Sequence, residues 1–190
     1  MASIDSLHTL LVEEIRDLYD AERRLVKAIP KMAKVAASED LSSALESHLE
    51  ETQQQVSRLE DVFGMLDVSA KAKTCAGMKG IIEEGDEHMK EDYEADSLRD
   101  AAIIGSAQRV EHYEIAAYGT AVAHARQLGL DRVARTLEQT LQEEKAADAK
   151  LTDLAESSIN VEAGEQDDES IDRTSSPSPA MSARGRNRSR

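Results

Sequence analysis

The chain has 190 residues, of which 3% are aromatic, three are proline and none is tryptophan, and this composition favours long helices packed around one core. The formal net charge of −15 argues against nucleic-acid binding by the folded body, because phosphate contacts need clustered Lys and Arg. No apolar run approaches the roughly 20 residues that span a bilayer, and no basic-then-apolar signal pattern precedes the first helix, so we predict a cytoplasmic protein without a membrane partner.

The first half of the chain predicts two long helices, because its apolar residues recur at helical spacing. The first helix spans residues 5–37, and Pro30 inside it predicts a kink or a short break. After a turn around residues 38–40, the second helix spans residues 41–66. Each of these helices has one apolar face that can be buried against the other.

The second half of the chain predicts a short helix and two long ones. A connection leads into a short helix over about residues 78–93, and a long helix follows over about 97–128. Gly129 to Asp131 supply the end of that helix and the cap of the next, which spans 132 to about 158. So short a link makes the last two helices antiparallel neighbours.

Together these elements predict an all-α fold, an antiparallel four-helix bundle with a short extra helix between the second and third long helices. The bundle occupies residues 1–158. Residues 159–190 form an acidic stretch followed by Ser, Pro and Arg, a composition typical of a disordered tail. Its arginines could contact an acidic partner, the bundle itself or nucleic acid.

Charged side chains lie among the apolar residues of all four long helices when each helix is drawn at about 100° per residue. Most lie near the centre of an apolar arc, and one on the second helix lies nearer its edge. The set is Glu22, His48, Glu51, Glu111, Glu114, Glu144 and Asp148. All are near the middle of their helices, so in an antiparallel bundle they should converge at one level.

Such a cluster needs neutralising, because an ionised group removed from water costs several kcal/mol even after relaxation. No Lys or Arg occupies the central part of any arc, and Lys145 at one edge comes nearest. We therefore predict two bound divalent ions, iron or manganese, whose ligands would be carboxylate oxygens and imidazole. The alternative is a loosely packed seam whose residues are half exposed, protonated or paired with water.

Four segments resemble the ferritin-like YciE/YciF family: DLYDAE at 17–22, HLEET at 48–52, VEHYEIA at 110–116 and EEKAAD at 143–148. The resemblance covers nearly all of residues 5–160. It implies a ferritin-like bundle with a di-metal centre, in a family of stress-associated bacterial proteins that are commonly dimeric. The family's ligand positions fall on the seven residues of the predicted cluster.

The chain departs from the broader ferritin-like pattern, in which two helices carry Glu-x-x-His. Its second helix has the reverse order, from His48 to Glu51, and Gln53 and Gln55 stand where some relatives have a further His. Its last helix has no His in the cluster. The site is therefore rich in oxygen donors, which fits iron or manganese better than zinc.

Other polar residues receive more ordinary interpretations. His112 follows Glu111 directly but lies about 100° around the helix, so we expect a packing or supporting role. Tyr19 and Tyr118 are interpreted as core residues in preference to phenols beside the metals. Cys75, the single cysteine, is expected to be an unreactive loop thiol.

The sequence is compatible with three functions. The first is an enzyme that oxidises ferrous iron or breaks down peroxide at paired metals. The second is a non-catalytic stress protein that binds or stores metal. The third is a purely structural helical dimer with water in its acidic seam.

Overall fold

The computed structural model describes residues 4–165. Residues 166–190, which include most of the predicted tail, lie outside the described residues. The described part consists of helices and their connections: α1 (Leu7–Val35), α2 (Glu39–Met65), α3 (Ala76–His88), α4 (Asp96–Gln127) and α5 (Asp131–Leu154), which leads into a π-helical turn (Ala155–Ile159). None of the described helices contains a stretch apolar enough to cross a membrane.

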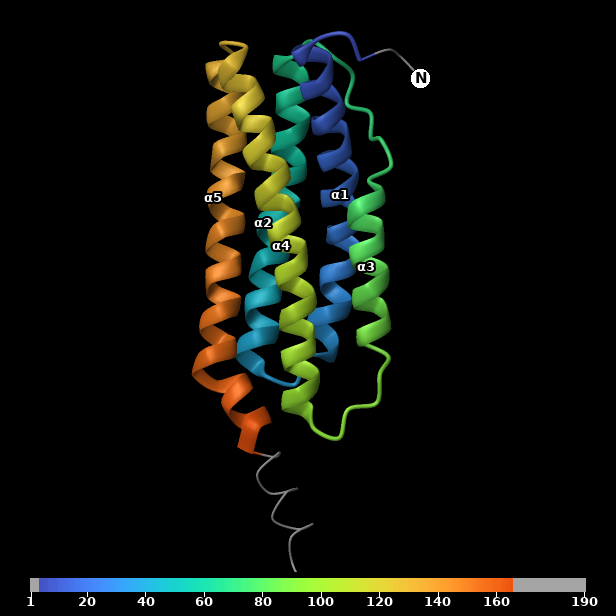
Figure 1. Ribbon diagram of the computed structural model, residues 1–190, viewed down its shortest axis with the longest axis vertical. Coiled ribbons are helices and arrows are strands. Elements are labelled where there is room, and N and C mark those ends of the chain that lie inside the picture. Colours follow the sequence, from blue (N-terminus) through green and yellow to red (C-terminus); the bar gives the residue numbers. More distant parts are fainter. Residues whose placement is uncertain (1–3, 166–190) are drawn as a thin grey trace, which may run out of the picture.

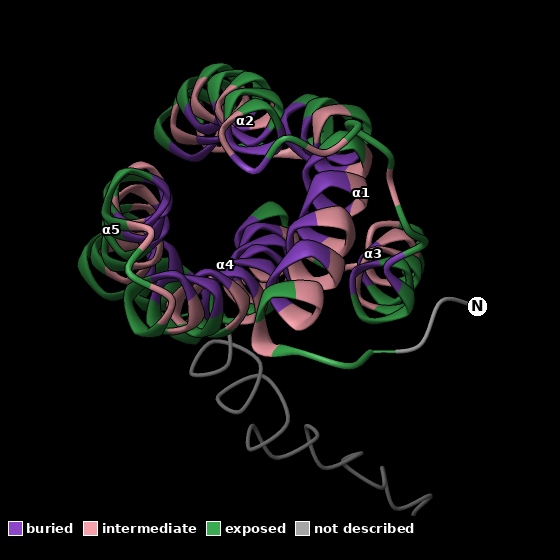
Figure 2. Cartoon of the chain, turned by 90° about the horizontal axis from the view of Figure 1, so that it is seen from above, coloured by how far each residue is buried: buried purple, intermediate pink, exposed green. Residues whose placement is uncertain are grey.

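Helices α1, α2, α4 and α5 form an antiparallel bundle, and α3 packs outside it against α1 and α4 (Figure 1). Seen from above, the buried faces of the four long helices point towards a shared interior (Figure 2). The predicted all-α bundle with a short extra helix is confirmed.

Helix ends are set by local side chains at several of the predicted positions. The Ser6 hydroxyl accepts a hydrogen bond from the Thr9 N–H at 3.1 Å, which caps α1. Gly129 adopts φ +69° directly after α4, a conformation in which glycine avoids the cost of a side chain. Asp131, predicted as the cap of the last helix, is instead its first residue.

The turn between α1 and α2 is attached to α4 by Asp100. This buried carboxylate accepts hydrogen bonds from the backbone N–H groups of Ala37 and Ser38, at 2.9 and 2.7 Å. These contacts satisfy donors that precede α2 and would otherwise lack partners. They fix the lower end of the bundle as drawn in Figure 1.

Of the two alternatives predicted at Pro30, the short break is wrong, since α1 continues without interruption from Leu7 to Val35, and the kink stays a prediction. Proline removes a single backbone donor from the helix. Its neighbours Ile29, Met32 and Ala33 are all buried in the core. Tertiary packing on both sides of the proline therefore keeps the helix continuous.

The apolar core is divided into two clusters along the bundle axis. One cluster contains Leu18 of α1 and Leu141 of α5, and the other contains Leu25 and Leu151 of the same two helices. Glu22 and the other charged residues of the predicted cluster occupy the level between them. The antiparallel arrangement therefore brings the middles of all four helices together, as the sequence predicts.

The helix that begins as α5 extends past the predicted end of the bundle. Helical structure continues from the π-helical turn to residue 165, which is beyond the predicted boundary at 158. Ile159 and Ala163 lie one turn apart and are both buried. Two apolar positions are too short a pattern to indicate a helix, so the sequence alone does not predict this extension.

We expect a chain that ends at residue 158 to be less stable than one that ends at residue 165. The shorter chain loses the buried side chain of Ile159, which is worth about 2 kcal/mol and so lowers the melting temperature by about 4 to 8 °C. Thermal unfolding followed by circular dichroism would measure the difference. Equal melting temperatures would show that the extension contributes nothing to stability.

Candidate metal centre

Five of the predicted ligands lie buried in the middle of the bundle. They come from all four long helices: Glu22 from α1, His48 from α2, Glu111 and Glu114 from α4, and Glu144 from α5. The four glutamates are at most 2% exposed, and His48 is 8% exposed. Carboxylates are almost never this buried unless something pairs with them.

Three of these side chains approach one another closely. His48 Nε2 lies 3.3 Å from Glu111 Oε1 and 3.8 Å from Glu144 Oε2. One donor atom from each of the three residues lies within 4.8 Å of the other two. An imidazole and two carboxylates at this spacing, supplied by three helices, can hold a single metal ion between them.

When the carboxyl groups are ionised, many donor atoms of the cluster have no hydrogen-bond partner within the described part of the chain. They are Glu22 Oε2, both ring nitrogens of His48, Glu111 Oε2, and both carboxylate oxygens of Glu114 and of Glu144. The short approach of His48 to Glu111 lacks hydrogen-bond geometry, so it does not satisfy the ring. A buried polar group without a partner costs about 1 to 3 kcal/mol. The residues present therefore fit a bound cation, which would satisfy these atoms together.

Burial also changes the acidity of the cluster. It raises the pKa of Glu22, Glu111 and Glu114 well above the ordinary value, because the charged form loses its hydration, and neighbouring carboxylates raise the pKa further. Burial raises the pKa of Glu144 too, although nearby His48 opposes this. The metal-free cluster therefore binds protons, and a metal ion would displace them.

Arg58 is a nearby cation that the sequence analysis missed. Its largely buried guanidinium makes two bonds to the Glu143 carboxylate, at 2.7 and 3.0 Å, and a third to Thr140. Its charge lowers the pKa of Glu22, although burial outweighs it. Arg58 lies at the edge of the apolar arc of α2, and its long side chain reaches inward. Because Glu143 already pairs with it, Arg58 does not neutralise the cluster.

Two uncharged polar side chains adjoin the charged level of the core. The Tyr118 hydroxyl donates a hydrogen bond to Glu22 Oε1, so Tyr118 is both a core residue and a direct partner of a predicted ligand. Gln55 is fully buried and donates to Glu143 at 3.2 Å, while its carbonyl oxygen has no partner among residues 4–165. Tyr19 instead donates to Glu60 at 2.7 Å.

The remaining two predicted ligands are not part of the buried group. Asp148 turns towards α4, where its Oδ1 accepts a hydrogen bond from Gln108 at 3.1 Å and lies 3.3 Å from His112 Nε2. The side chain of Glu51 is 46% exposed, with Oε2 3.5 Å from His48 Nδ1. Glu51 therefore lies at the edge of the cluster, as its position on the helix wheel predicts.

Cys75 is buried, whereas the sequence predicts an ordinary loop thiol. Its sulfur accepts a hydrogen bond from the Met78 N–H at the start of α3 and lies 3.0 Å from the Tyr113 hydroxyl. Burial raises the pKa of the Cys75 thiol, which keeps it protonated. The prediction of low reactivity therefore has a physical basis.

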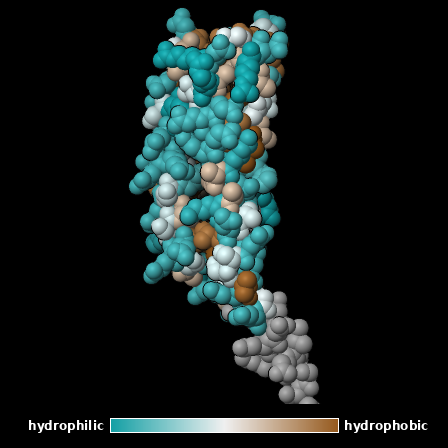
Figure 3. Space-filling view, turned by 90° about the vertical axis from the view of Figure 1, so that its left-hand side faces the viewer, coloured by the Kyte–Doolittle hydropathy of each residue, from teal (hydrophilic) through white to brown (hydrophobic). Residues whose placement is uncertain are grey.

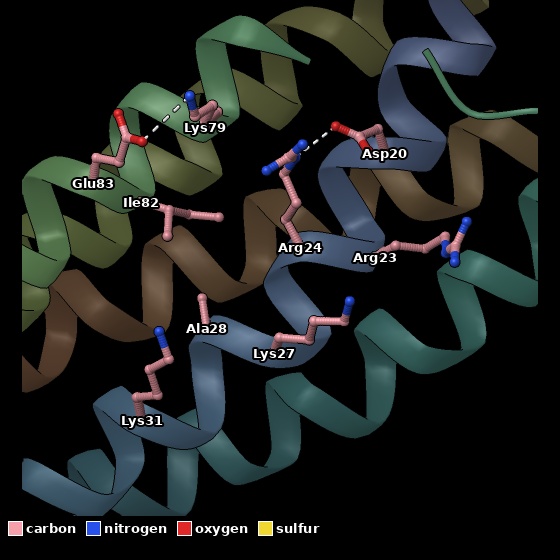
Figure 4. Close-up of a pocket in the computed structure, with 9 residues that line it drawn as sticks. All are labelled: Asp20, Arg23, Arg24, Lys27, Ala28, Lys31, Lys79, Ile82 and Glu83. Carbon is pink, nitrogen blue, oxygen red and sulfur yellow. Dashed lines mark hydrogen bonds and ion pairs between the residues drawn. The ribbon is translucent and has the colours of Figure 1, made fainter. Parts of the chain in front are cut away.

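A separate hollow of about 370 Å³ lies between α1 and α3 and contains none of the predicted ligands (Figure 4). Its charged lining residues are Asp20, Arg23, Arg24, Lys27, Lys31, Lys79 and Glu83. Asp20 pairs with Arg24, and Glu83 pairs with Lys79. Because much of its charge is paired internally, we interpret this hollow as an ion-paired surface groove.

Comparison with known proteins identifies the family of the chain that carries this buried cluster. Residues 6–164 match the family described as Domain of unknown function (DUF892). The chain belongs to this family. Protein YciF of Escherichia coli (strain K12) is 42% identical over 162 residues, which cover 85% of this chain and 97% of YciF.

Two solved structures resemble the fold described above. The crystal structure of the E. coli stress protein YciF matches with a TM-score of 0.79 and 42% identity, covering 83% of this chain and 99% of that one. YcfI from Rhodopseudomonas palustris matches with a TM-score of 0.76 and 45% identity, covering 79% and 95%. The resemblance to the YciE/YciF family and the ferritin-like packing of the helices are confirmed.

Proposed function

We propose that the buried cluster binds two divalent metal ions, iron or manganese, and that the protein oxidises ferrous iron or consumes peroxide. The observation that carries this proposal is the group of buried carboxylate and imidazole atoms without hydrogen-bond partners. Four buried glutamates carry four negative charges when ionised, and two divalent ions balance them. The description of the relative YciF as a stress protein supports a role in a stress response.

The proposed ligands divide between the two ions. His48, Glu111 and Glu144 hold one ion, because their donor atoms already lie within 4.8 Å of one another. Glu22 and Glu114 are proposed as ligands of the second ion, because both are fully buried and Glu22 raises the pKa of Glu114 by charge repulsion. The half-exposed Glu51 and Asp148, which turns towards Gln108 on α4, are proposed as ligands at the edge of the centre.

The other residues around the cluster would prepare it for this role. A pair of iron or manganese ions supplies two-electron redox chemistry with oxygen or peroxide. Tyr118 orients the Glu22 carboxylate through its hydroxyl. The apolar clusters above and below the charged level exclude bulk water, and the Arg58 and Glu143 pair stiffens the boundary between α2 and α5.

Metal content and oxygen consumption test this proposal together. Protein purified without chelator is expected to retain about two ions per chain, and metal-free protein given ferrous iron is expected to consume oxygen. The double variant Glu111→Gln/Glu114→Gln should neither retain metal nor consume oxygen. The exposed control Glu50→Gln should behave as the unmutated protein in both measurements. Retained metal without oxygen or peroxide consumption would indicate a non-catalytic metal-binding protein. No retained metal would indicate a structural bundle whose carboxyl groups are protonated.

The compartment and the oligomeric state belong to the same proposal. We expect a cytoplasmic homodimer, as in the family resemblance described above. Light scattering coupled to size-exclusion chromatography would give the number of chains in the particle.

A further inference from the structure

A cluster this deeply buried requires a path by which ions reach it. Apolar clusters close the bundle above and below the charged level. At the seam between α4 and α5, Gln108 donates hydrogen bonds to Asp148 at 3.1 Å and to Thr152 at 2.9 Å. These bonds link the two helices beside the cluster and obstruct entry from that side.

A cavity of about 130 Å³ lies at the seam between α2 and α5 and reaches the cluster directly. Figure 2 shows that these two helices are more widely separated than α1 and α2 or α4 and α5. The buried side chains of His48 and Glu111 line the cavity, and both carry buried atoms without partners. Ala147 and the exposed Lys150 of α5 line it as well.

The residues that border this cavity suit the passage of a small cation. Ala44 on α2 and Ala147 on α5 are short, so the seam stays open between them. Glu51 is half exposed and its carboxylate lies 3.5 Å from His48 Nδ1, so one side chain connects solvent with the ligand set. The surface that carries α5 is otherwise largely hydrophilic, with apolar residues only in small groups (Figure 3).

We propose that divalent cations enter the metal centre through the cavity between α2 and α5, with Glu51 as the ligand that captures them. This inference rests on the proposed metal centre and adds a route to it. Glu51 binds a hydrated cation at the surface and passes it to His48 and Glu111. The pair formed by Arg58 and Glu143 joins α2 to α5 further along the seam, which limits the entrance to the level of His48.

Blocking the cavity should slow metal uptake without removing any ligand. The probe is Co²⁺ added to metal-free protein without oxygen, with the visible absorbance of the bound ion followed in a stopped-flow instrument. Ala147→Leu fills part of the cavity from a partly exposed position and should slow uptake by about tenfold or more, because close-packed interiors admit ions poorly. The final amount of bound Co²⁺ and its equilibrium affinity should stay unchanged. The matched control Ala149→Leu, exposed on α5 and outside the cavity lining, should load at the normal rate.

Charge changes at the entrance give a second test that leaves the packing intact. Lys150→Glu should speed Co²⁺ uptake by about tenfold at low salt, and Glu51→Gln should slow it, because a negative entrance raises the local cation concentration. Both effects should shrink at high salt. Normal uptake rates in Ala147→Leu and in both charge variants would overturn the entrance but leave the metal centre standing. No Co²⁺ binding by the unmutated protein would overturn both.

Discussion

Replacing Glu144 by glutamine is expected to change the stability of the metal-free and metal-loaded proteins in opposite directions. Glu144 is fully buried, and both of its carboxylate oxygens lack hydrogen-bond partners. Without metal, Glu144→Gln removes a source of repulsion acting on Glu22 and Glu111. The free energy of unfolding should therefore stay level or rise by about 1 to 3 kcal/mol.

With metal present, the same substitution removes a ligand and a balancing charge. A ligand at 100 times its dissociation constant stabilises a fold by about 2.7 kcal/mol, and much of that gain should be lost in Glu144→Gln. Urea unfolding with chelator and with excess Mn²⁺ would measure both effects. The exposed control Glu50→Gln should be neutral in both conditions. If the seam is purely structural, Glu144→Gln should change the free energy of unfolding in the same direction with and without metal. That result would exclude metal binding by the cluster.

The stability of the metal-free protein is expected to fall as the pH rises above about 5. Burial raises the pKa of Glu22, Glu111 and Glu114 in the folded state, so the folded protein binds more protons than the unfolded chain. The contribution of these carboxyl groups to stability is fully present below their pKa in the unfolded chain. It is lost as the pH rises through their raised pKa in the folded protein. The slope is about 1.4 kcal/mol per pH unit for each extra proton bound.

Carboxylates with lowered pKa do not disturb this pH window. Their partners hold the pKa of Glu13, Asp20 and Glu143 below the ordinary range, so their contributions change only at lower pH. The metal-loaded protein should show the opposite slope, because metal binding requires deprotonated carboxylates. Urea unfolding at pH 5, 6, 7 and 8 would give both slopes. The variant Glu111→Gln/Glu114→Gln should flatten the metal-free slope, and an equally steep slope in that variant would place its origin elsewhere.

Much of the fold could be predicted because its signals are local. Ser6 and Gly129 mark helix ends through side-chain capping and a positive φ, and the short link at Gly129 determines the antiparallel order of α4 and α5. The continuous helix through Pro30 could not be predicted in this way. It depends on burial of Ile29, Met32 and Ala33 against other helices, which the local sequence does not contain.

In the candidate site, the positions of residues on their helices could be predicted from the sequence, but the directions of their side chains could not. The wheel positions of His48, Glu111 and Glu144 were sufficient to predict that they converge. Asp148 shares the face of Glu144 one turn along α5, yet its carboxylate turns to Gln108 on α4. A helical wheel gives the direction of the Cα–Cβ bond but not the conformation of the rest of the side chain. For the same reason, the sequence does not predict that the side chain of Arg58 extends inward.

Whether the buried cluster binds two metal ions is best tested by a crystal structure of protein loaded with Fe²⁺ or Mn²⁺, with anomalous diffraction measured at both metal edges. Two anomalous peaks are expected at the buried level between the apolar clusters, one of them between His48, Glu111 and Glu144. Anomalous maps without a peak at this level, from crystals grown with excess metal, would contradict metal binding by the cluster.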